Sequence, residues 1–327
     1  MDWRGKVVAV TGAGGFIGSH LAERLVELGA DVRAMVHYNA LGTHGWLDTS
    51  PLAERMTVVA GDIVDRDSVR DLMTGADTVF HLAALIAIPY SYRAPSSYVR
   101  SNVEGTMNVV QAARELGTRR VIHTSTSEVY GTARYVPIDE AHPLQGQSPY
   151  SATKIGADKI AESFFKSFDV PVVTVRPFNT FGPRQSARAV IPTIITQVLA
   201  GETVRLGSLA PTRDMNFVSN TVDGFVAAAE SDAAIGESIN LGSGREITIG
   251  DLAEMIARLA GRPMHIETQS DRLRPEASEV ERLLAANEKA GRLLNWEPRV
   301  SLESGLETTI EWIEAHMERY RPGVYAV

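Results

Sequence analysis

Residues 6–18 read Lys6-Val-Val-Ala-Val-Thr11-Gly12-Ala-Gly-Gly15-Phe16-Ile-Gly18, an apolar run that leads directly into a glycine-rich turn. The run has the length and β-branched content of a buried strand, and a helical pattern follows it. Gly12 permits a tight turn, Gly15 lets backbone approach a pyrophosphate, and Gly18 allows a helix to pack close to the strand. The free N–H groups of a helix that begins near Phe16 would face the phosphates. The stretch therefore predicts a strand–turn–helix unit that binds a dinucleotide.

Short β-branched runs alternate with longer helical patterns through the first half of the chain. This alternation indicates βαβ units and a parallel sheet. The runs are almost wholly apolar, as expected when helices cover both faces of the sheet. We expect strands near 6–11, 32–37, 56–60, 77–82, 119–124 and 171–176, and helices near 16–29, 97–117 and 149–168. The predicted fold is α/β, a Rossmann-type doubly wound parallel sheet with a smaller C-terminal substrate domain.

The alternation becomes irregular after Pro177, where prolines and arginines interrupt it. We therefore expect a dinucleotide-binding domain over residues 1–177 and a substrate-binding domain over residues 178–327. Residues 216–245 are expected to return to the first domain. They would form strands at 216–218 and 238–241 around a helix at 219–230.

Composition narrows the class of protein. The 327 residues are 44% hydrophobic and 22% charged, which is typical of a globular protein with a full core. A formal charge of −8 argues against nucleic acid or an anionic membrane as the main partner. The absence of cysteine excludes disulfides and thiolate sites, and the histidines show no metal-ligand spacing, so we predict no metal. The first strand begins at Lys6 and no signal peptide is visible, so we expect a cytoplasmic protein.

Two further segments suit a dinucleotide. His81-Leu82-Ala83-Ala84 ends the fourth predicted strand with small residues that would let the cofactor lie against backbone. Asp62 follows the third predicted strand, where its carboxylate could accept from the adenine amino group, although it could also cap a helix. NAD enzymes of this fold usually carry Asp or Glu at the end of the second strand, and NADP enzymes often carry Arg nearby. The sequence has His37 there, so NADP stays open while we expect NAD. The full set of cofactor candidates is Gly12, Gly15, Phe16, Ile17, Gly18, His37, Asp62, Ile63, Leu82, Ala83, Ala84, Thr124, Tyr150, Lys154 and Pro177.

Tyr150 and Lys154 lie one helical turn apart and so share a helix face. A free phenol has a pKa of about 10, and bringing it near 7 takes about 4 kcal/mol. The lysine ammonium and an oxidised nicotinamide would both favour the phenolate, which could then act as a base. Thr126 or Ser125 should orient the reacting hydroxyl. Asn102 is expected to give structural support near Lys154.

These residues together resemble the extended short-chain dehydrogenase/reductase family. The resemblance continues through Arg176-Pro177-Phe178-Asn179 and through residues 213–218. Within that family, Thr126-Ser127-Glu128 is similar to the triplet of GDP-mannose 4,6-dehydratases. The stretches 85–92, 143–150 and 185–192 are similar to N-acetylhexosamine 4,6-dehydratases of legionaminic-acid-type pathways. The resemblance implies an enzyme that removes water from a nucleotide-diphosphate sugar, with a tightly bound NAD that each turnover regenerates, and a homodimer formed through 97–117 and 149–168.

The resemblance also assigns site residues. The catalytic set that it implies is Thr126, Ser127, Glu128, Tyr150 and Lys154. The planar guanidinium of arginine can donate two parallel hydrogen bonds to a phosphate. Arg213 and Arg274 are the main candidates for binding the diphosphate, and Asn179 is expected to contact phosphate or sugar. Arg184 and Arg188 are further candidates, although surface arginines are commonly only solvated. Ser125 and Thr126 would bind the sugar. Val190 and Ile191 could line the base pocket, which core packing explains equally well.

The implied mechanism is a hypothesis with three steps. Tyr150 removes the C4 hydroxyl proton while hydride passes from C4 to the cofactor. Glu128 then removes the C5 proton and the C6 hydroxyl leaves, with Ser127 relaying a proton through water. Hydride finally returns to C6 and a proton to C5. UDP- or GDP-N-acetylglucosamine is the expected substrate, while the nucleotide, the C2 substituent, the pathway and the acid that protonates the leaving group stay open.

Several other functions share most of these residues. A 5,6-dehydratase would end in an exocyclic alkene on the same kind of substrate. A UDP-glucuronate decarboxylase would need a cation for the sugar carboxylate, which the sequence does not place. A 4-epimerase would not require Glu128. A binding-only redox sensor on this fold would typically lose the Tyr150 and Lys154 pair, which this chain keeps.

Overall fold

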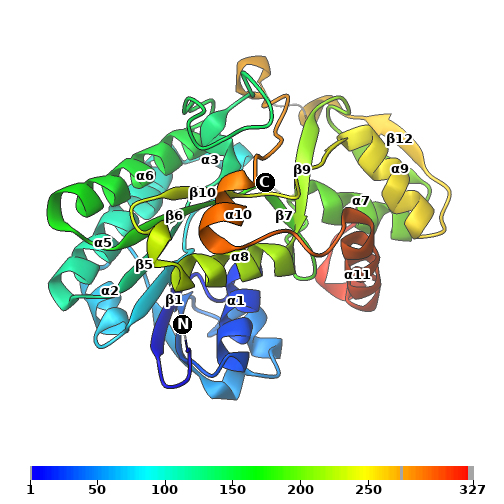
Figure 1. Cartoon of the computed structure of the whole chain (residues 1–327). Coiled ribbons are helices and arrows are strands. Elements are labelled where there is room, and N and C mark those ends of the chain that lie inside the picture. The colour runs from blue at the N-terminus through cyan, green and yellow to red at the C-terminus, as the bar shows by residue number, and fades with distance from the viewer. Residues whose placement is uncertain (1, 273–274, 323–327) are drawn as a thin grey trace.

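The computed structural model of the protein describes residues 2–272 and 275–322. Its centre is a seven-stranded sheet in the order β10-β6-β5-β4-β1-β2-β3, in which every neighbouring pair is parallel (Figure 1). The strands are β1 (Val7–Thr11), β2 (Asp31–His37), β3 (Met56–Gly61), β4 (Thr78–His81), β5 (Arg120–Thr124), β6 (Val172–Pro177) and β10 (Ser238–Leu241). The six strands expected from the sequence are present, each within one residue of its expected ends, and the doubly wound α/β fold is confirmed.

Helices cover both faces of this sheet, which explains why its strands are apolar throughout. On one face α2 (Arg66–Met73), α5 (Gly105–Leu116) and α6 (Pro149–Phe168) lie side by side and share one core cluster. On the other face α1 (Phe16–Glu27) packs on α8 (Val218–Glu230), and α10 (Glu288–Leu294) packs on α8 and β10. The strand order reverses between β1 and β4, so the carboxyl ends of these two strands form the switch point where such folds bind ligands.

The helix expected over 97–117 is divided. It consists of α4 (Pro95–Tyr98), a π-helical turn over Val99–Glu104 and α5, and α3 (Ile88–Arg93) precedes it. The sequence pattern did not predict α2, whose start is fixed by Asp65. The Asp65 carboxylate accepts from the backbone N–H groups of Asp67 and Ser68.

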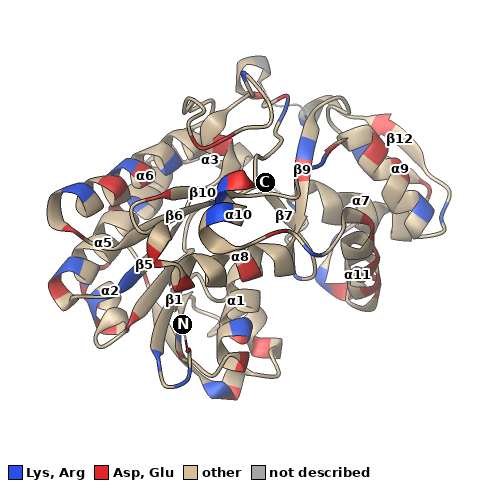
Figure 2. Ribbon diagram, in the orientation of Figure 1, with Lys and Arg blue, Asp and Glu red and all other residues tan. Residues whose placement is uncertain are grey.

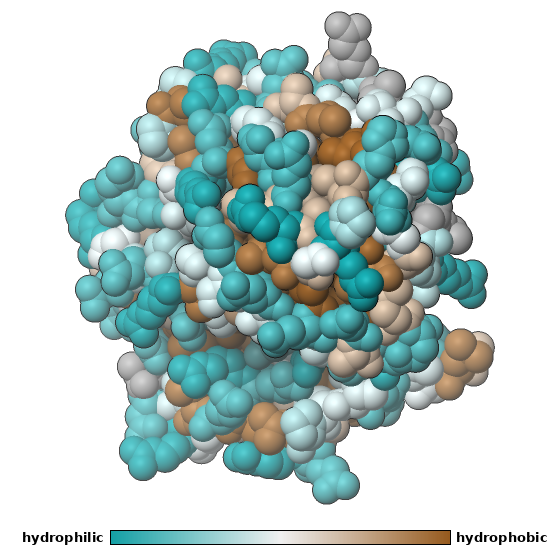
Figure 3. Space-filling view, turned by 90° about the vertical axis from the view of Figure 1, so that its right-hand side faces the viewer, coloured by the Kyte–Doolittle hydropathy of each residue, from teal (hydrophilic) through white to brown (hydrophobic). Residues whose placement is uncertain are grey.

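The second half of the chain builds a smaller unit with its own core. A three-stranded sheet, β11-β9-β7, and a two-stranded sheet, β12-β8, pack with three helices around a second hydrophobic cluster. The elements are β7 (Asn179–Phe181), α7 (Val190–Ala200), β8 (Thr203–Leu206), β9 (Thr212–Phe217), β11 (Glu246–Thr248), α9 (Ile249–Leu259), β12 (His265–Thr268) and α11 (Leu302–Ala315). Seen from the side of α9 and α11, most of the surface is hydrophilic, with hydrophobic side chains set between the hydrophilic ones (Figure 3).

The expectation that residues 216–218 form a strand returning to the large sheet is wrong. Asn216 and Phe217 end β9, which pairs with β7 and β11 in the three-stranded sheet. The return is made by α8, which packs against α1, and by β10, which pairs with β6. A short apolar strand carries no signal for its partner, so the sequence could not choose between the two sheets. The division of the chain at residue 177 stays a prediction.

Charged residues of both signs are interspersed along α2, α5 and α6 (Figure 2). Among the described residues, no helix is both long and apolar enough to cross a membrane.

Asp214 on β9 joins three segments of the smaller unit. Its carboxylate is buried and accepts from Ser243 N (2.6 Å), Gly244 N (3.0 Å) and Ala285 N (3.1 Å). We expect Asp214→Ala to lower the free energy of unfolding by about 3 kcal/mol, because it leaves three backbone N–H groups, including the buried one of Ala285, without their acceptor. Urea unfolding measures this loss. The control Asp223→Ala removes an exposed carboxylate and should cost under about 0.5 kcal/mol. A loss below about 1 kcal/mol in Asp214→Ala would contradict the account.

Candidate active site

The glycine loop between β1 and α1 is closed by backbone contacts that leave no room for a side chain at Gly12 or Gly18. Gly12 has φ +72°, and a Cβ there would lie 2.8 Å from Ala83 N, just beyond the end of β4. A Cβ on Gly18 would lie 2.1 Å from the Gly12 carbonyl oxygen. Gly15 is the N-cap of α1 and offers no side-chain cap, so N–H groups of the first turn remain available to an anion.

The end of β4 is tied to β1 beneath this loop. The Thr11 hydroxyl oxygen accepts from Leu82 N and Ala83 N, both at 3.1 Å. Ala83 is therefore held against Gly12, as the small residues at this position suggested. The segment after β2 also reaches the loop, since Trp46 N donates to the Gly14 carbonyl at 3.0 Å. No pattern in the sequence predicted this contact of Trp46.

Three other cofactor candidates occupy defined places. Asp62 accepts from Val64 N at 2.9 Å, while Asp65 caps α2, so the alternative that Asp62 caps a helix is wrong. Ile63 is buried in the core, where it fills the space that a side chain at Gly105 would take. His37 ends β2 and is exposed. Like the sequence, this strand end does not choose between NAD and NADP.

These residues fit a dinucleotide. The glycine loop is a cradle with free N–H groups at the start of α1, at the switch point of the sheet. The hydroxyl oxygen of Thr124, at the end of β5, is buried without a hydrogen-bond partner among the described residues. A buried polar atom of this kind costs about 1–3 kcal/mol unless a ligand or water satisfies it.

Helix α6 carries the predicted tyrosine and lysine. It begins with a capping box in which Ser148 and Ser151 exchange hydrogen bonds, which fixes its first turn. Tyr150 and Lys154 follow on its buried face, with 7% and 4% of their surface exposed. The Lys154 ammonium donates to the Thr124 carbonyl at 2.6 Å. The helix therefore presents both side chains to the carboxyl end of β5.

The pKa values of this pair are set mainly by burial. Burial raises the pKa of Tyr150 above its usual value; a hydrogen bond with Thr126 lowers it and the charge of Glu128 raises it. Burial lowers the pKa of Lys154 to about 8, although the charge of Asp158 opposes this. Burial is the largest cause acting on Tyr150, so the protein's own groups raise its pKa and do not meet the expectation of a value near 7.

The triplet after β5 forms a tight turn. Thr126 is the N-cap of the 3₁₀ turn Ser127–Tyr130, and its hydroxyl oxygen accepts from Glu128 N at 3.2 Å. Glu128 is partly exposed, whereas Ser127 is 2% exposed. The charge of Glu128 raises the pKa of the Tyr150 phenol. The turn that carries Thr126, Ser127 and Glu128 therefore lies close to Tyr150.

Ser125 is directed elsewhere. Its hydroxyl donates to the Asp158 carboxylate at 2.8 Å, and the residue is 4% exposed. The expectation that Ser125 binds substrate is therefore corrected, because its one donor is committed inside the core. Thr126 remains the candidate that orients the reacting hydroxyl.

The segment before α5 supports Tyr150. Asn102 is buried; its amide accepts from Leu85 N at 2.9 Å and donates to the Thr153 hydroxyl at 3.1 Å. The ring of Tyr98 meets that of Tyr150 edge-on, with centroids 6.3 Å apart. The sequence analysis did not identify Tyr98, which has no motif of its own.

The candidates for the nucleotide-sugar diphosphate fall into two groups. Arg213 is 7% exposed on β9, with its guanidinium 3.3 Å from the Glu279 carboxylate. Asn179, at the start of β7, has a buried amide nitrogen without a partner among the described residues. Val190 begins α7 and is partly exposed. These residues lie in elements that follow the carboxyl end of β6 or belong to the smaller unit.

Arg184 does not join that group. Its guanidinium donates to Glu23 at 2.9 Å and to Ser19 at 3.2 Å, both on α1, so it links the chain after β7 to the first helix. These contacts use three of the five N–H donors of its guanidinium, so the expectation that Arg184 binds substrate stays a prediction. Arg188 is exposed, Ile191 is buried in the core of the smaller unit, and Arg274 lies outside the described residues. Within the described part of the chain, no group of three or more acidic or histidine side chains is placed to hold a metal ion.

Known proteins are similar to this chain over nearly its whole length. The family model described as GDP-mannose 4,6 dehydratase matches residues 9–309. A UDP-glucose 4-epimerase from Mycolicibacterium smegmatis is 33% identical, over 93% of this chain and 97% of that protein. A dTDP-glucose 4,6-dehydratase from Actinoplanes is also 33% identical, over 94% and 98%. The structure of the dTDP-glucose 4,6-dehydratase DesIV from Streptomyces venezuelae, with NAD bound, has a TM-score of 0.87 at 28% identity and covers 96% of this chain and 98% of that chain.

Gly15 gives a test of the cradle. A Cβ at Gly15 would meet only the Gly12 carbonyl oxygen, at 3.2 Å, so alanine fits the folded chain with a small adjustment. It would nevertheless fill space that a pyrophosphate needs. We expect Gly15→Ala to leave the melting temperature nearly unchanged and to weaken NAD binding at least about tenfold, measured by calorimetric titration.

Gly201→Ala is the matched control for this change, because the added Cβ meets open space there. Equal affinity for NAD in wild type and Gly15→Ala would show that the cradle does not hold the pyrophosphate.

Proposed function

The chain belongs to the family of nucleotide-sugar dehydratases and epimerases that the GDP-mannose 4,6 dehydratase model describes, and we propose that it is a 4,6-dehydratase of UDP- or GDP-N-acetylglucosamine. The observation that carries this proposal is the carboxylate of Glu128, whose charge reaches the buried phenol of Tyr150. Oxidation at C4 alone needs no second base. A carboxylate beside the tyrosine adds a base for the C5 proton, which elimination requires.

We propose NAD as the cofactor, because the similar DesIV structure has NAD bound. Gly12, Gly15 and Gly18 would hold its pyrophosphate, and Thr124 and Lys154 lie where its nicotinamide half would meet the catalytic helix. When bound, NAD would supply the hydride acceptor for C4 and, once reduced, the hydride donor for C6. NADP remains a second possibility, since His37 supplies neither the acidic nor the arginine marker.

The chain's own residues would divide the proton transfers. Tyr150 takes the proton of the C4 hydroxyl, with Thr126 as its hydrogen-bond partner and with Lys154 as the cation that favours the phenolate. Because burial raises the pKa of Tyr150, the phenolate needs this cation and the positive charge of the oxidised cofactor. Glu128 takes the C5 proton and exchanges it with solvent, and a solvent-derived proton is later delivered to C5. Ser127 is buried, which favours a water as the donor to the departing C6 hydroxyl.

A 4-epimerase is the second candidate, because the UDP-glucose 4-epimerase of M. smegmatis is as similar as the dehydratase of Actinoplanes. An epimerase must return hydride to C4 and never breaks the C5–H bond. The fate of that bond therefore separates the two functions.

We expect purified protein, given UDP- or GDP-N-acetylglucosamine in heavy water, to release one water per sugar and to place deuterium at C5. Mass spectrometry and proton NMR of the product measure both. A product of unchanged mass without deuterium would support the epimerase and would remove the proposed role of Glu128.

Glu128→Gln should separate the half-reactions, because the amide cannot take the C5 proton. We expect net dehydration to fall by roughly 10²–10⁴-fold, while reduced nicotinamide still forms and accumulates in single-turnover absorbance. Tyr150→Phe should abolish both steps and serves as the control. Normal turnover by Glu128→Gln would contradict the mechanism.

We also propose a homodimer formed through the outer faces of the π-helical turn, α5 and α6. Three large hydrophobic side chains lie exposed there, Val99 (52%), Met107 (42%) and Phe168 (42%). Exposed apolar side chains on neighbouring helices are typical of subunit interfaces. We expect wild type to elute at twice the monomer mass in light-scattering chromatography and Met107→Glu to shift toward monomer. A monomeric wild type would contradict this proposal.

A further inference from the structure

Helix α6 carries a third inward-facing polar residue, one turn beyond Lys154. Tyr150, Lys154 and Asp158 are spaced by four, so they are stacked on one helix face. Asp158 is 4% exposed, like Lys154, and the proposed chemistry assigns it no role. A carboxylate at this depth is costly unless other groups compensate for its charge.

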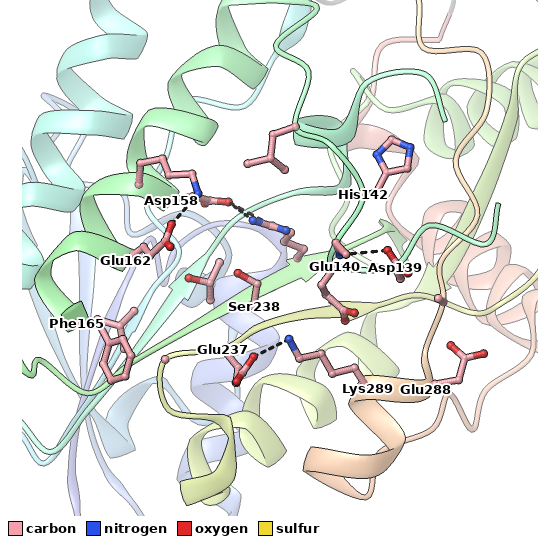
Figure 4. Close-up of a pocket in the computed structure, with 18 of the residues that line it drawn as sticks. Asp139, Glu140, His142, Asp158, Glu162, Phe165, Glu237, Ser238, Glu288 and Lys289 are labelled. Carbon is pink, nitrogen blue, oxygen red and sulfur yellow. Dashed lines mark hydrogen bonds and ion pairs between the residues drawn. The ribbon is translucent and has the colours of Figure 1, made fainter. Parts of the chain in front are cut away.

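Three residues from the sheet compensate for the Asp158 charge. His123 on β5 contacts one carboxylate oxygen at 3.0 Å, and Ser125 donates to the other at 2.8 Å. Arg176 on β6 donates to that second oxygen from Nη2 at 3.1 Å. Figure 4 shows Asp158 pointing from α6 toward this guanidinium. Burial acts to raise the pKa of Asp158, but these partners outweigh burial, so its pKa is lowered and the carboxylate is an anion.

The two histidines near Lys154 do not carry charge. Burial lowers the pKa of His123, and Lys154 and Arg176 act in the same direction although Asp158 opposes them. Burial also holds the pKa of His81, on β4, well below its usual value. The rings of His81 and His123 are stacked with centroids 5.9 Å apart. His123 then donates from Nε2 to Asp158, which fits its Nδ1 having no partner among the described residues.

The charged and titratable groups of the Lys154 site come from several elements. From β6 comes the cation Arg176; from β4 and β5 come the neutral imidazoles; from α6 come Asp158 and the phenol of Tyr150. Glu128, on the turn after β5, acts on Tyr150 and lies toward the open side of the site. Among the described residues, Asp158 is the one anion that acts to raise the pKa of Lys154, which burial lowers to about 8.

We infer that Asp158 is a positioning residue of the hydride-transfer site, whose buried carboxylate keeps Lys154 in its ammonium form against the carboxyl end of β5. Without this anion, the Lys154 ammonium would lie in a buried site where burial acts against its charge. Lysine buried in this way loses its proton near or below neutral pH. The inference rests on the proposed function, because there the Lys154 cation favours the Tyr150 phenolate.

The test is a direct titration of Lys154 that needs no substrate. The sequence contains five lysines, so ¹³Cε-lysine labelling gives a simple spectrum, and Lys154→Arg identifies the Lys154 signal. We expect a wild-type midpoint of about 8. Asp158→Asn, which keeps the shape and can still hydrogen-bond, should lower the midpoint by at least about one pH unit. Asp158→Glu should restore it.

Glu162→Gln is the matched control. Glu162 lies one turn further along α6 and lines the same cavity as Asp158 in Figure 4, but it pairs with Lys159 and is half-exposed. It should leave the Lys154 midpoint unchanged. A folded Asp158→Asn protein with the wild-type midpoint would overturn the inference. So would a wild-type midpoint below pH 7, which needs no variant and applies even if Asp158→Asn does not fold.

The pH profile gives a second readout. Lys154 acts as the ammonium ion, so hydride transfer is lost as pH rises through its pKa. Asp158→Asn lowers that pKa, and the alkaline limb of the single-turnover rate should move to lower pH by the same amount. If the nucleotide sugars give no product, the proposed function fails but the titration still decides the role of Asp158.

Discussion

A single buried carboxylate, that of Asp158, determines how the catalytic helix sits on the sheet. Its charge is tolerated in the core only because β5, the turn after β5, and β6 each supply a partner. Those partners leave α6 little freedom to slide or rotate. Lys154 and Tyr150, one and two turns earlier on the same face, are consequently fixed against Thr124 and Thr126, respectively. A charge that is unfavourable in isolation thus gives the site its geometry.

The other half of the site depends on close backbone contact. Gly12 and Gly18 bring α1, β1 and the end of β4 together at distances that no Cβ would permit. The resulting cradle lies beside the reversal of strand order, where the carboxyl ends of parallel strands leave a crevice. Cofactor loop and catalytic helix therefore come from separate βα units, and the sheet between them sets their separation. Arg184, through its ion pair with Glu23, ties the chain after β7 to the same helix α1.

The similar proteins are named for different reactions. An epimerase and a dehydratase are each 33% identical to this chain over more than nine-tenths of its length. A shared fold does not by itself decide which reaction follows. In this chain the further chemistry would depend on a short turn, Ser127–Tyr130, that holds one carboxylate near the phenol.

The sequence by itself determined the parallel sheet, the glycine loop and the helix that carries Tyr150 and Lys154, because each depends on local periodicity or on spacing along one element. The sequence also places Asp158 four residues after Lys154, but this spacing does not show which groups Asp158 contacts. Only the tertiary structure decided which polar groups pair. Ser125 turned to Asp158, Arg184 to Glu23, and residues 216–217 to the smaller sheet, because these partners lie far apart in the chain. Burial, a property of the folded whole, set the pKa values of Tyr150 and Lys154.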